Sequence, residues 1–315
     1  MIAVDIGTTY GALLIGGLFS AALCGILFVQ IVLYFKLYIS DSWGYKALVL
    51  TVWLLDALHS GFVWASIWNY LIAFFGVSSH IAEIPSTLPV TIVLTAILTF
   101  FVHCFFAHRI FRLSRSNWYI TIPILVLAFC RLCSASVTGA EMLRLHTYQA
   151  FKAQFRWVFS LGLALSSAAD VTITISLCML LRSSRTRSLS LNHIIDSLIL
   201  YTFETGTLTA AATIASMICW LTMNDNLVFM GLHFVIGKLY ANSLLATLNS
   251  RHELRRAHTV VSRDAIGAGC RSPSSDKARL SPQNLRNGIC GLQAGDLMSV
   301  DLERSLEEGS AMIGV

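Results

Sequence analysis

The sequence contains few charged residues. Asp, Glu, Lys and Arg make up only 12% of its 315 residues, about half of the ~25% found in soluble domains. Hydrophobic residues account for 56% of the chain, and the mean hydropathy is +0.69. This composition indicates that the surroundings of the protein are lipid rather than water. We therefore expect the lipid bilayer to be its first partner and expect no nucleic-acid partner.

Apolar stretches long enough to cross a bilayer recur along the chain. About 20 helical residues at 1.5 Å each cover the ~30 Å hydrocarbon core. Continuous apolar runs predict helices, because strands of a membrane barrel would alternate apolar and polar residues. The predicted fold class is therefore all-α, an integral membrane bundle of seven helices within residues 1–250. The predicted spans are 11–35, 47–69, 87–108, 118–140, 158–181, 194–220 and 226–249.

The predicted outer loops contain no cysteine and the chain has no Asn-x-Ser/Thr glycosylation site. Six of the eight cysteines fall inside predicted spans, where a free thiol packs as a small apolar group. Cys130 and Cys133 form a CxxC pair, but without a second pair it is a weak metal signal and indicates packing. The cysteines therefore predict no disulfide framework, and we expect no metal or other cofactor.

The distribution of basic residues predicts the orientation in the membrane. One set of loops, including the start of the tail, carries twelve Lys and Arg residues, and the opposite set carries three. Loops rich in Lys and Arg face the cytoplasm. We therefore expect the amino terminus outside and the carboxyl terminus in the cytoplasm, with the plasma membrane as the location.

Residues 251–315 differ in composition from the rest of the chain. They are polar, mixed in charge and rich in Ser, Gly and Arg, and such a segment cannot bury enough apolar surface to fold alone. We predict a disordered cytoplasmic tail. Its first residues, with Arg251, Arg255 and Arg256, are open to two interpretations: a short basic helix against anionic headgroups, or a cluster that only sets topology.

Four segments resemble a known group of membrane proteins. They read GALLIGGLFSAALCGILFVQIVLYF, VWLLDALHSGFVWASIWNYLIAFFG, FFVHCFFAHRIFRLS and GKLYANSLLATLNSR. The chain from about residue 10 to 255 is similar to the seven-span proteins of mushroom-forming fungi that are classified only as a domain of unknown function. The resemblance implies a fungal multi-pass protein and brings no catalytic or ligand residues with it.

Charged residues inside the spans are the strongest functional signal, because an intramembrane charge is energetically costly. Five of them, on five different spans, fall within about 6 Å of depth at 1.5 Å per residue. We predict that Lys238 forms an internal ion pair, and that the excess of three acids over two bases leaves one carboxyl protonated or paired with a ligand cation. The predicted polar layer comprises Asp56, His59, Arg131, Asp170, Glu204, Lys238 and Asn242.

Two catalytic or cofactor interpretations of these residues are disfavoured. Lys238 could anchor retinal, but microbial rhodopsins place an aspartate four residues earlier, where this chain has Phe234. Asp56 and His59 share a helix face and suggest a metal-dependent intramembrane hydrolase, but zinc needs at least three protein ligands. The other two candidate ligands are His103 and His233. They lie at different predicted depths, so one zinc ion cannot reach both. We therefore expect a protein that is not an enzyme.

Topology favours a receptor-like or sensor protein. Seven spans, an outer amino terminus and an Arg-rich inner face with a tail fit a small-molecule ligand in the bundle and a cytoplasmic protein partner at that face. The third span ends in AHRIF and the seventh contains YANSLL without proline, so the likeness to G-protein-coupled receptors is topological only. A small-solute or proton-coupled transporter is the alternative, although no internal repeat is evident.

Overall fold

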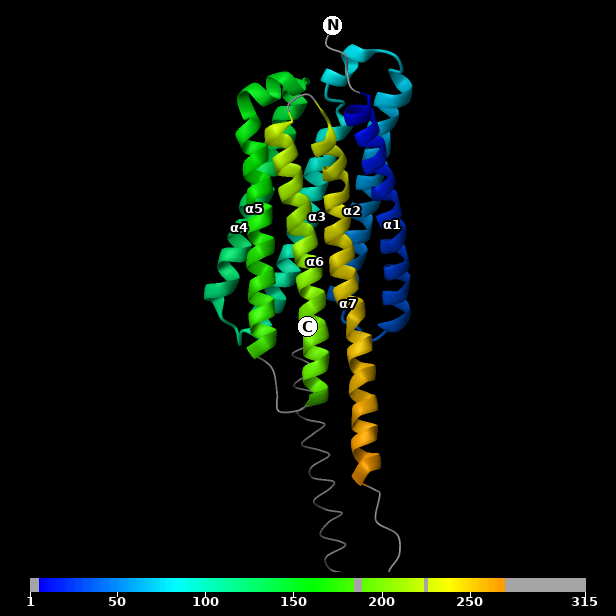
Figure 1. Cartoon of the computed structure of the whole chain (residues 1–315), viewed down its shortest axis with the longest axis vertical. Coiled ribbons are helices and arrows are strands. Elements are labelled where there is room, and N and C mark those ends of the chain that lie inside the picture. The colour runs from blue at the N-terminus through cyan, green and yellow to red at the C-terminus, as the bar shows by residue number, and fades with distance from the viewer. Residues whose placement is uncertain (1–5, 184–188, 224–225, 270–315) are drawn as a thin grey trace, which may run out of the picture.

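The computed structural model describes residues 6–183, 189–223 and 226–269. Within these ranges the chain forms seven long helices that stand side by side along the long axis, and no β-strand (Figure 1). Each helix has a stretch long and apolar enough to cross a membrane, so the protein is an integral multi-pass membrane protein with the predicted all-α fold. The helices are α1 (Ala12–Leu37), α2 (Trp43–Trp68), α3 (Thr87–Leu113), α4 (Trp118–Leu145), α5 (Tyr148–Ser183), α6 (Leu189–Thr222) and α7 (Val228–Gly269).

The two ends of the bundle differ in their connections. At the N-terminal end, where α1 begins, lie three short helices, η1 (Gly7–Gly11), η2 (Asn69–Ala73) and η3 (Ser78–Ala82). The same end holds the α2–α3, α4–α5 and α6–α7 connections. At the C-terminal end lie the α1–α2 and α3–α4 connections, and α7 extends beyond its neighbours there (Figure 1).

Helix α5 begins ten residues before the predicted span. The prediction started at 158 because two basic residues lower the hydropathy before it, whereas the helix starts at Tyr148. Both charges find partners at the end of α6: the Lys152 ammonium lies 5.0 Å from the centroid of the Trp220 ring, and Arg156 donates to the Leu221 carbonyl. Non-helical backbone dihedral angles at Phe155 separate the segment that begins at Tyr148 from the rest of α5.

Helix α7 also continues past its predicted end. The predicted tail begins at 251, but the helix runs to Gly269, because no proline or glycine interrupts the sequence between Ser250 and Gly267. The rest of the predicted tail, residues 270–315, lies outside the described residues.

The membrane-spanning part of α7 forms the centre of the bundle. In an 18-residue apolar stretch of α7, 72% of the residues are buried, whereas 28% are buried in the corresponding stretch of α1. Helix α1 crosses α7 where two glycines meet: a Cβ added at Gly16 would lie 2.4 Å from the Gly231 carbonyl oxygen. Farther along, the side chains of Asn242 and Asn249 donate to carbonyls of α1, at 3.1 and 2.8 Å. The two backbones are therefore in direct contact at one end and joined by amide hydrogen bonds toward the other.

Candidate functional site

The buried ion pair between α2 and α7 lies at the centre of the polar layer. The Lys238 ammonium is 2.8 Å from Asp56 Oδ1, and the two residues are 0% and 1% exposed. The same ammonium donates to the Asp56 carbonyl at 2.9 Å and to Ser60 Oγ at 2.6 Å. The prediction that Lys238 has an internal ion-pair partner is confirmed.

Helical spacing explains why one lysine reaches three acceptors on α2. Ser60 follows Asp56 by four residues and so lies on the same helix face. Its hydroxyl donates to the Asp56 carbonyl at 2.9 Å and leaves its oxygen free to accept from Lys238. On α7, Asn242 lies one turn after Lys238 and its amide donates to the Lys238 carbonyl at 2.8 Å. The ammonium is therefore held by three oxygens of α2, while Asn242 bonds to the backbone of α7 one turn away.

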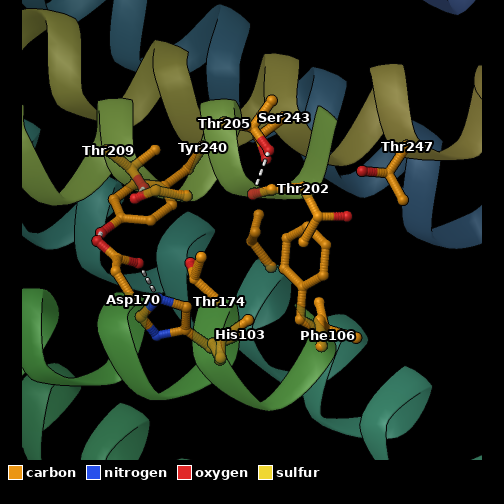
Figure 2. A pocket seen from close by; sticks show the side chains of 14 residues that line it. His103, Phe106, Asp170, Thr174, Thr202, Thr205, Thr209, Tyr240, Ser243 and Thr247 are labelled. Carbon is orange, nitrogen blue, oxygen red and sulfur yellow. Dashed lines mark hydrogen bonds and ion pairs between the residues drawn. The ribbon is translucent and has the colours of Figure 1, made fainter. Parts of the chain in front are cut away.

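A second cluster surrounds Asp170 on α5. His103 Nε2 of α3 lies 3.2 Å from Oδ1, and the Tyr240 hydroxyl of α7 donates to Oδ2 at 2.6 Å (Figure 2). Ser166 Oγ lies 2.9 Å from the Tyr240 oxygen, and it acts as the donor there because the tyrosine proton is directed to Asp170. Both carboxylate oxygens of Asp170 are thus bonded, each by a side chain from a different helix.

Arg131 of α4 and two histidines lie between the two clusters. Arg131 is 3% exposed and close enough to Asp170 to interact electrostatically. His233 is within the same range of Arg131, and His59 is within range of both Lys238 and His233. The ring nitrogens of both histidines are buried and have no hydrogen-bond partner within the described part of the chain. The polar layer is therefore one electrostatically connected set that crosses the bundle.

Glu204 does not belong to this set, and its inclusion in the predicted layer is wrong. Its side chain is exposed on α6, beside Leu200, Phe203 and Leu208, which are 59%, 54% and 55% exposed. The predicted depth was compatible with the layer, but the helix turns this face away from the bundle. Without Glu204 the buried set has two acids, Asp56 and Asp170, and two bases. The acids and bases are therefore equal in number, and the predicted excess of one acid is wrong.

A narrow crevice leads away from the Asp170 cluster between α3, α5, α6 and α7 (Figure 2). Its volume is only about 20 Å³, enough for about one ordered water. Hydroxyl groups line it. They belong to Thr174, Thr202, Thr205, Thr209, Tyr240, Ser243 and Thr247.

A wider pocket lies at the N-terminal end of the bundle, with a volume of about 440 Å³. Its walls come from the α2–α3 and α4–α5 connections, which are joined by an isolated bridge between Glu83 and Thr147 and by a 2.7 Å hydrogen bond from the Ile84 amide to the His146 carbonyl. His80 Nδ1 lies 2.8 Å from the Glu83 carboxylate, and its ring stacks on Phe74 with centroids 3.7 Å apart.

Neither cavity is lined by Lys238, and its ammonium is already occupied by three oxygens. Among the described residues no group of three or more His, Cys, Asp or Glu side chains is placed to hold a metal ion. Cys130 and Cys133 are both exposed on α4, on the face that the bundle presents to its surroundings. These positions give no support to a retinal anchor or a metal centre.

Comparison with known proteins adds one finding. Residues 166–253 match the model of a family of unknown function (DUF6534). Comparisons with curated proteins and with solved structures find no match. The matched segment covers α5 from Ser166 onward, α6 and the spanning part of α7, and so includes Asp170, Lys238 and Tyr240.

The predicted layer lacks Tyr240, His103 and His233, which the structure places in it. Tyr240 bonds to Asp170 and is 2% exposed, but a tyrosine in an apolar span carries no charge and resembles ordinary packing. Its position two residues after Lys238 gave no signal, because residues two apart on a helix do not share a face. His103 was considered only as a candidate zinc ligand, and the structure makes it a direct partner of Asp170.

Proposed function

We propose that the protein is a non-catalytic, receptor-like sensor that binds a small molecule in the pocket at its N-terminal end. The observation that carries this proposal is the pocket itself. At about 440 Å³ it falls within the 300–1,000 Å³ typical of small-molecule sites. Its position at the membrane surface, above a bundle of unbroken spanning helices, suits ligand detection better than transport, which usually uses helices broken near the midplane.

The pocket favours a small polar ligand that carries a hydrogen-bond donor. The Glu83 side chain is 59% exposed, so its carboxylate is accessible to a ligand although it already pairs with His80. Asn69, Thr87 and Thr147 add neutral polar groups, and Phe74 adds an aromatic face. Asn69 follows directly after α2, the helix that bears Asp56. Ligand binding would therefore act on the helix that holds one half of the buried ion pair.

A Glu83→Gln variant tests the site. We expect a thermal-shift screen of small polar molecules to find compounds that stabilise the purified protein and bind Glu83→Gln at least about tenfold more weakly, because a hydrogen bond to a charged group contributes about 1.5–3 kcal/mol. Glu141→Gln is the matched control, since Glu141 lies at the same end of the bundle, paired with Arg144 and outside the pocket. Equal losses in both variants would contradict the assignment. Accumulation of a bound compound inside proteoliposomes would instead identify a transporter.

The proposal includes an orientation in the plasma membrane. With the N-terminal end outside, the pocket faces the cell exterior, and the twelve basic residues counted in the sequence face the cytoplasm, where they offer a surface to a protein partner. The fungal origin implied by the sequence resemblance is part of the same proposal.

A tag placed after Val315 tests this orientation. We expect protease added to intact cells to leave the tag uncut and to remove it once the membrane is permeabilised. A tag before Met1 serves as the control and should be cut in both conditions. Cleavage of the Val315 tag on intact cells would show that the orientation is inverted.

A further inference from the structure

The crevice beside Asp170 runs from the middle of the bundle toward its C-terminal end. Thr247 lies three residues before the end of the spanning part of α7, and Leu177 lies six residues before the end of α5. Asp170 and Tyr240 line the crevice at the level of the polar layer. Figure 2 shows Thr247 on the opposite side of the crevice from the Asp170 carboxylate. The crevice thus lies between the acid and the bundle end that is proposed to face the cytoplasm.

Four hydroxyls along the crevice are without a hydrogen-bond partner in the described chain: those of Thr174, Thr202, Ser243 and Thr247. These residues are 8%, 7%, 8% and 7% exposed, whereas Lys238, at the same level of α7 as Tyr240, is 0% exposed. A water-sized sphere therefore reaches the crevice hydroxyls but not the Lys238–Asp56 pair. Buried hydroxyls without protein partners are the groups that ordered water satisfies.

Asp170 faces titratable or charged groups from three of the four helices around it. Helix α3 contributes His103, α7 contributes Tyr240, and α4 contributes Arg131 within electrostatic range. Helix α6 contributes three threonines and Gly206 to the crevice walls, none of them titratable near neutral pH. Asp170 and His103 therefore supply a carboxylate and an imidazole in direct contact, the side-chain types that most often accept and donate protons in proteins.

We propose that Asp170 and His103 form a proton-binding site that is supplied through the hydroxyl-lined crevice from the C-terminal end of the bundle. One proton already lies in the hydrogen bond between His103 Nε2 and Asp170 Oδ1. A further proton from water adds at His103 Nδ1, which has no hydrogen-bond partner in the described chain, and raises the net charge of the pair by one. Nothing else is consumed, and release returns the proton to water. This site is separate from the ligand pocket and does not depend on it. It would let the pH on that side of the membrane change the bonding between α3, α5 and α7.

The direct partners of Asp170 distinguish it from Asp56, the other buried acid of the layer. Asp56 already has an ammonium at 2.8 Å and is sealed from water, so protonating it would leave the lysine charge without a partner. Asp170 has a histidine and a tyrosine as direct partners instead. A proton added to this pair can be shared between two groups that both accept it.

Infrared spectroscopy of the purified full chain in lipid nanodiscs tests the proposal. We expect lowering the pH to produce a protonated-carboxyl or imidazolium band that is lost in Asp170→Asn. Asparagine keeps an acceptor for Tyr240 and a donor for His103, so the fold should be retained. Glu204→Gln, which changes a carboxylate outside the layer, should leave the band in place. A band that persists unchanged in Asp170→Asn, or one that follows sodium concentration at constant pH, would overturn the proposal.

A second variant tests the route and leaves the cluster intact. Thr247→Phe fills the crevice, and after a pH jump we expect the band to appear about tenfold more slowly or slower still, equivalent to a barrier raised by about 1.4 kcal/mol. Thr207→Phe is the control, because Thr207 is exposed on α6 and does not line the crevice. Equal rates in the wild type and both variants would overturn the crevice as the proton path, whether or not Asp170→Asn folds.

Discussion

Replacing Lys238 by methionine is expected to destabilise the bundle strongly. The change leaves the Asp56 carboxylate buried at 1% exposure without its counter-charge, and its Oδ2 atom has no hydrogen-bond partner within the described residues. Removing one partner of a buried ion pair costs about 3–5 kcal/mol, a large part of the ~5–15 kcal/mol that stabilises a typical domain. Thermal unfolding in detergent, followed by size-exclusion chromatography, measures the loss.

Two further variants separate the charge from the loss of a side chain. Asp56→Asn combined with Lys238→Met removes both charges, and we expect it to recover much of the stability that Lys238→Met alone loses. Lys36→Met makes the same chemical change at an exposed position near the end of α1 and should have little effect. If Lys238→Met unfolds at the temperature of the wild type, the ion pair contributes nothing to stability.

A leucine at Gly16 is expected to separate α1 from α7. The added Cβ would lie 2.4 Å from the Gly231 carbonyl oxygen, and a backbone atom cannot turn aside as a flexible side chain can. Overpacking ordinarily costs about 1–3 kcal/mol. We expect a loss at or above the upper end of that range, because the whole crossing must move and the hydrogen bonds from Asn242 and Asn249 to α1 move with it.

Gly25 provides the matched control on the same helix. A Cβ there would meet nothing within 4 Å, so Gly25→Leu adds an equal volume on an open face. Thermal unfolding of both variants beside the wild type checks the prediction. Equal stability of Gly16→Leu and Gly25→Leu would show that α1 and α7 do not cross at these glycines.

The sequence allowed the spans to be predicted because hydropathy is a strong local signal over 20 residues. It also allowed the Lys238 ion pair to be predicted, because an unpaired charge at that depth is costly. It did not allow the start of α5 to be predicted. Lys152 and Arg156 lower the local hydropathy, and their partners Trp220 and Leu221 lie more than 60 residues away in the chain.

Glu204 and Tyr240 show the limit of reasoning from depth alone. Counting residues from a span end fixes the height of a side chain but not the direction in which it leaves the helix. Glu204 has the right height and points away from the bundle, whereas Tyr240 carries no charge and points to Asp170. Direction follows from how each helix is rotated against its neighbours, and close contacts between distant segments, such as Gly206 of α6 against Thr174 of α5, determine that rotation.

Solid-state NMR in lipid bilayers provides the most direct measurement of the buried ion pair. With lysine labelled at Nζ with ¹⁵N and aspartate labelled at the carboxyl with ¹³C, the Lys238 signal is the one that Lys238→Met removes. The 2.8 Å distance from Nζ to Asp56 Oδ1 places the carboxyl carbon within about 4 Å of the nitrogen, given a C–O bond of about 1.2 Å. We predict strong dipolar dephasing of this signal that is lost in Asp56→Asn. A Lys238 signal without dephasing would place the ammonium far from every aspartate and contradict a bundle built around this pair.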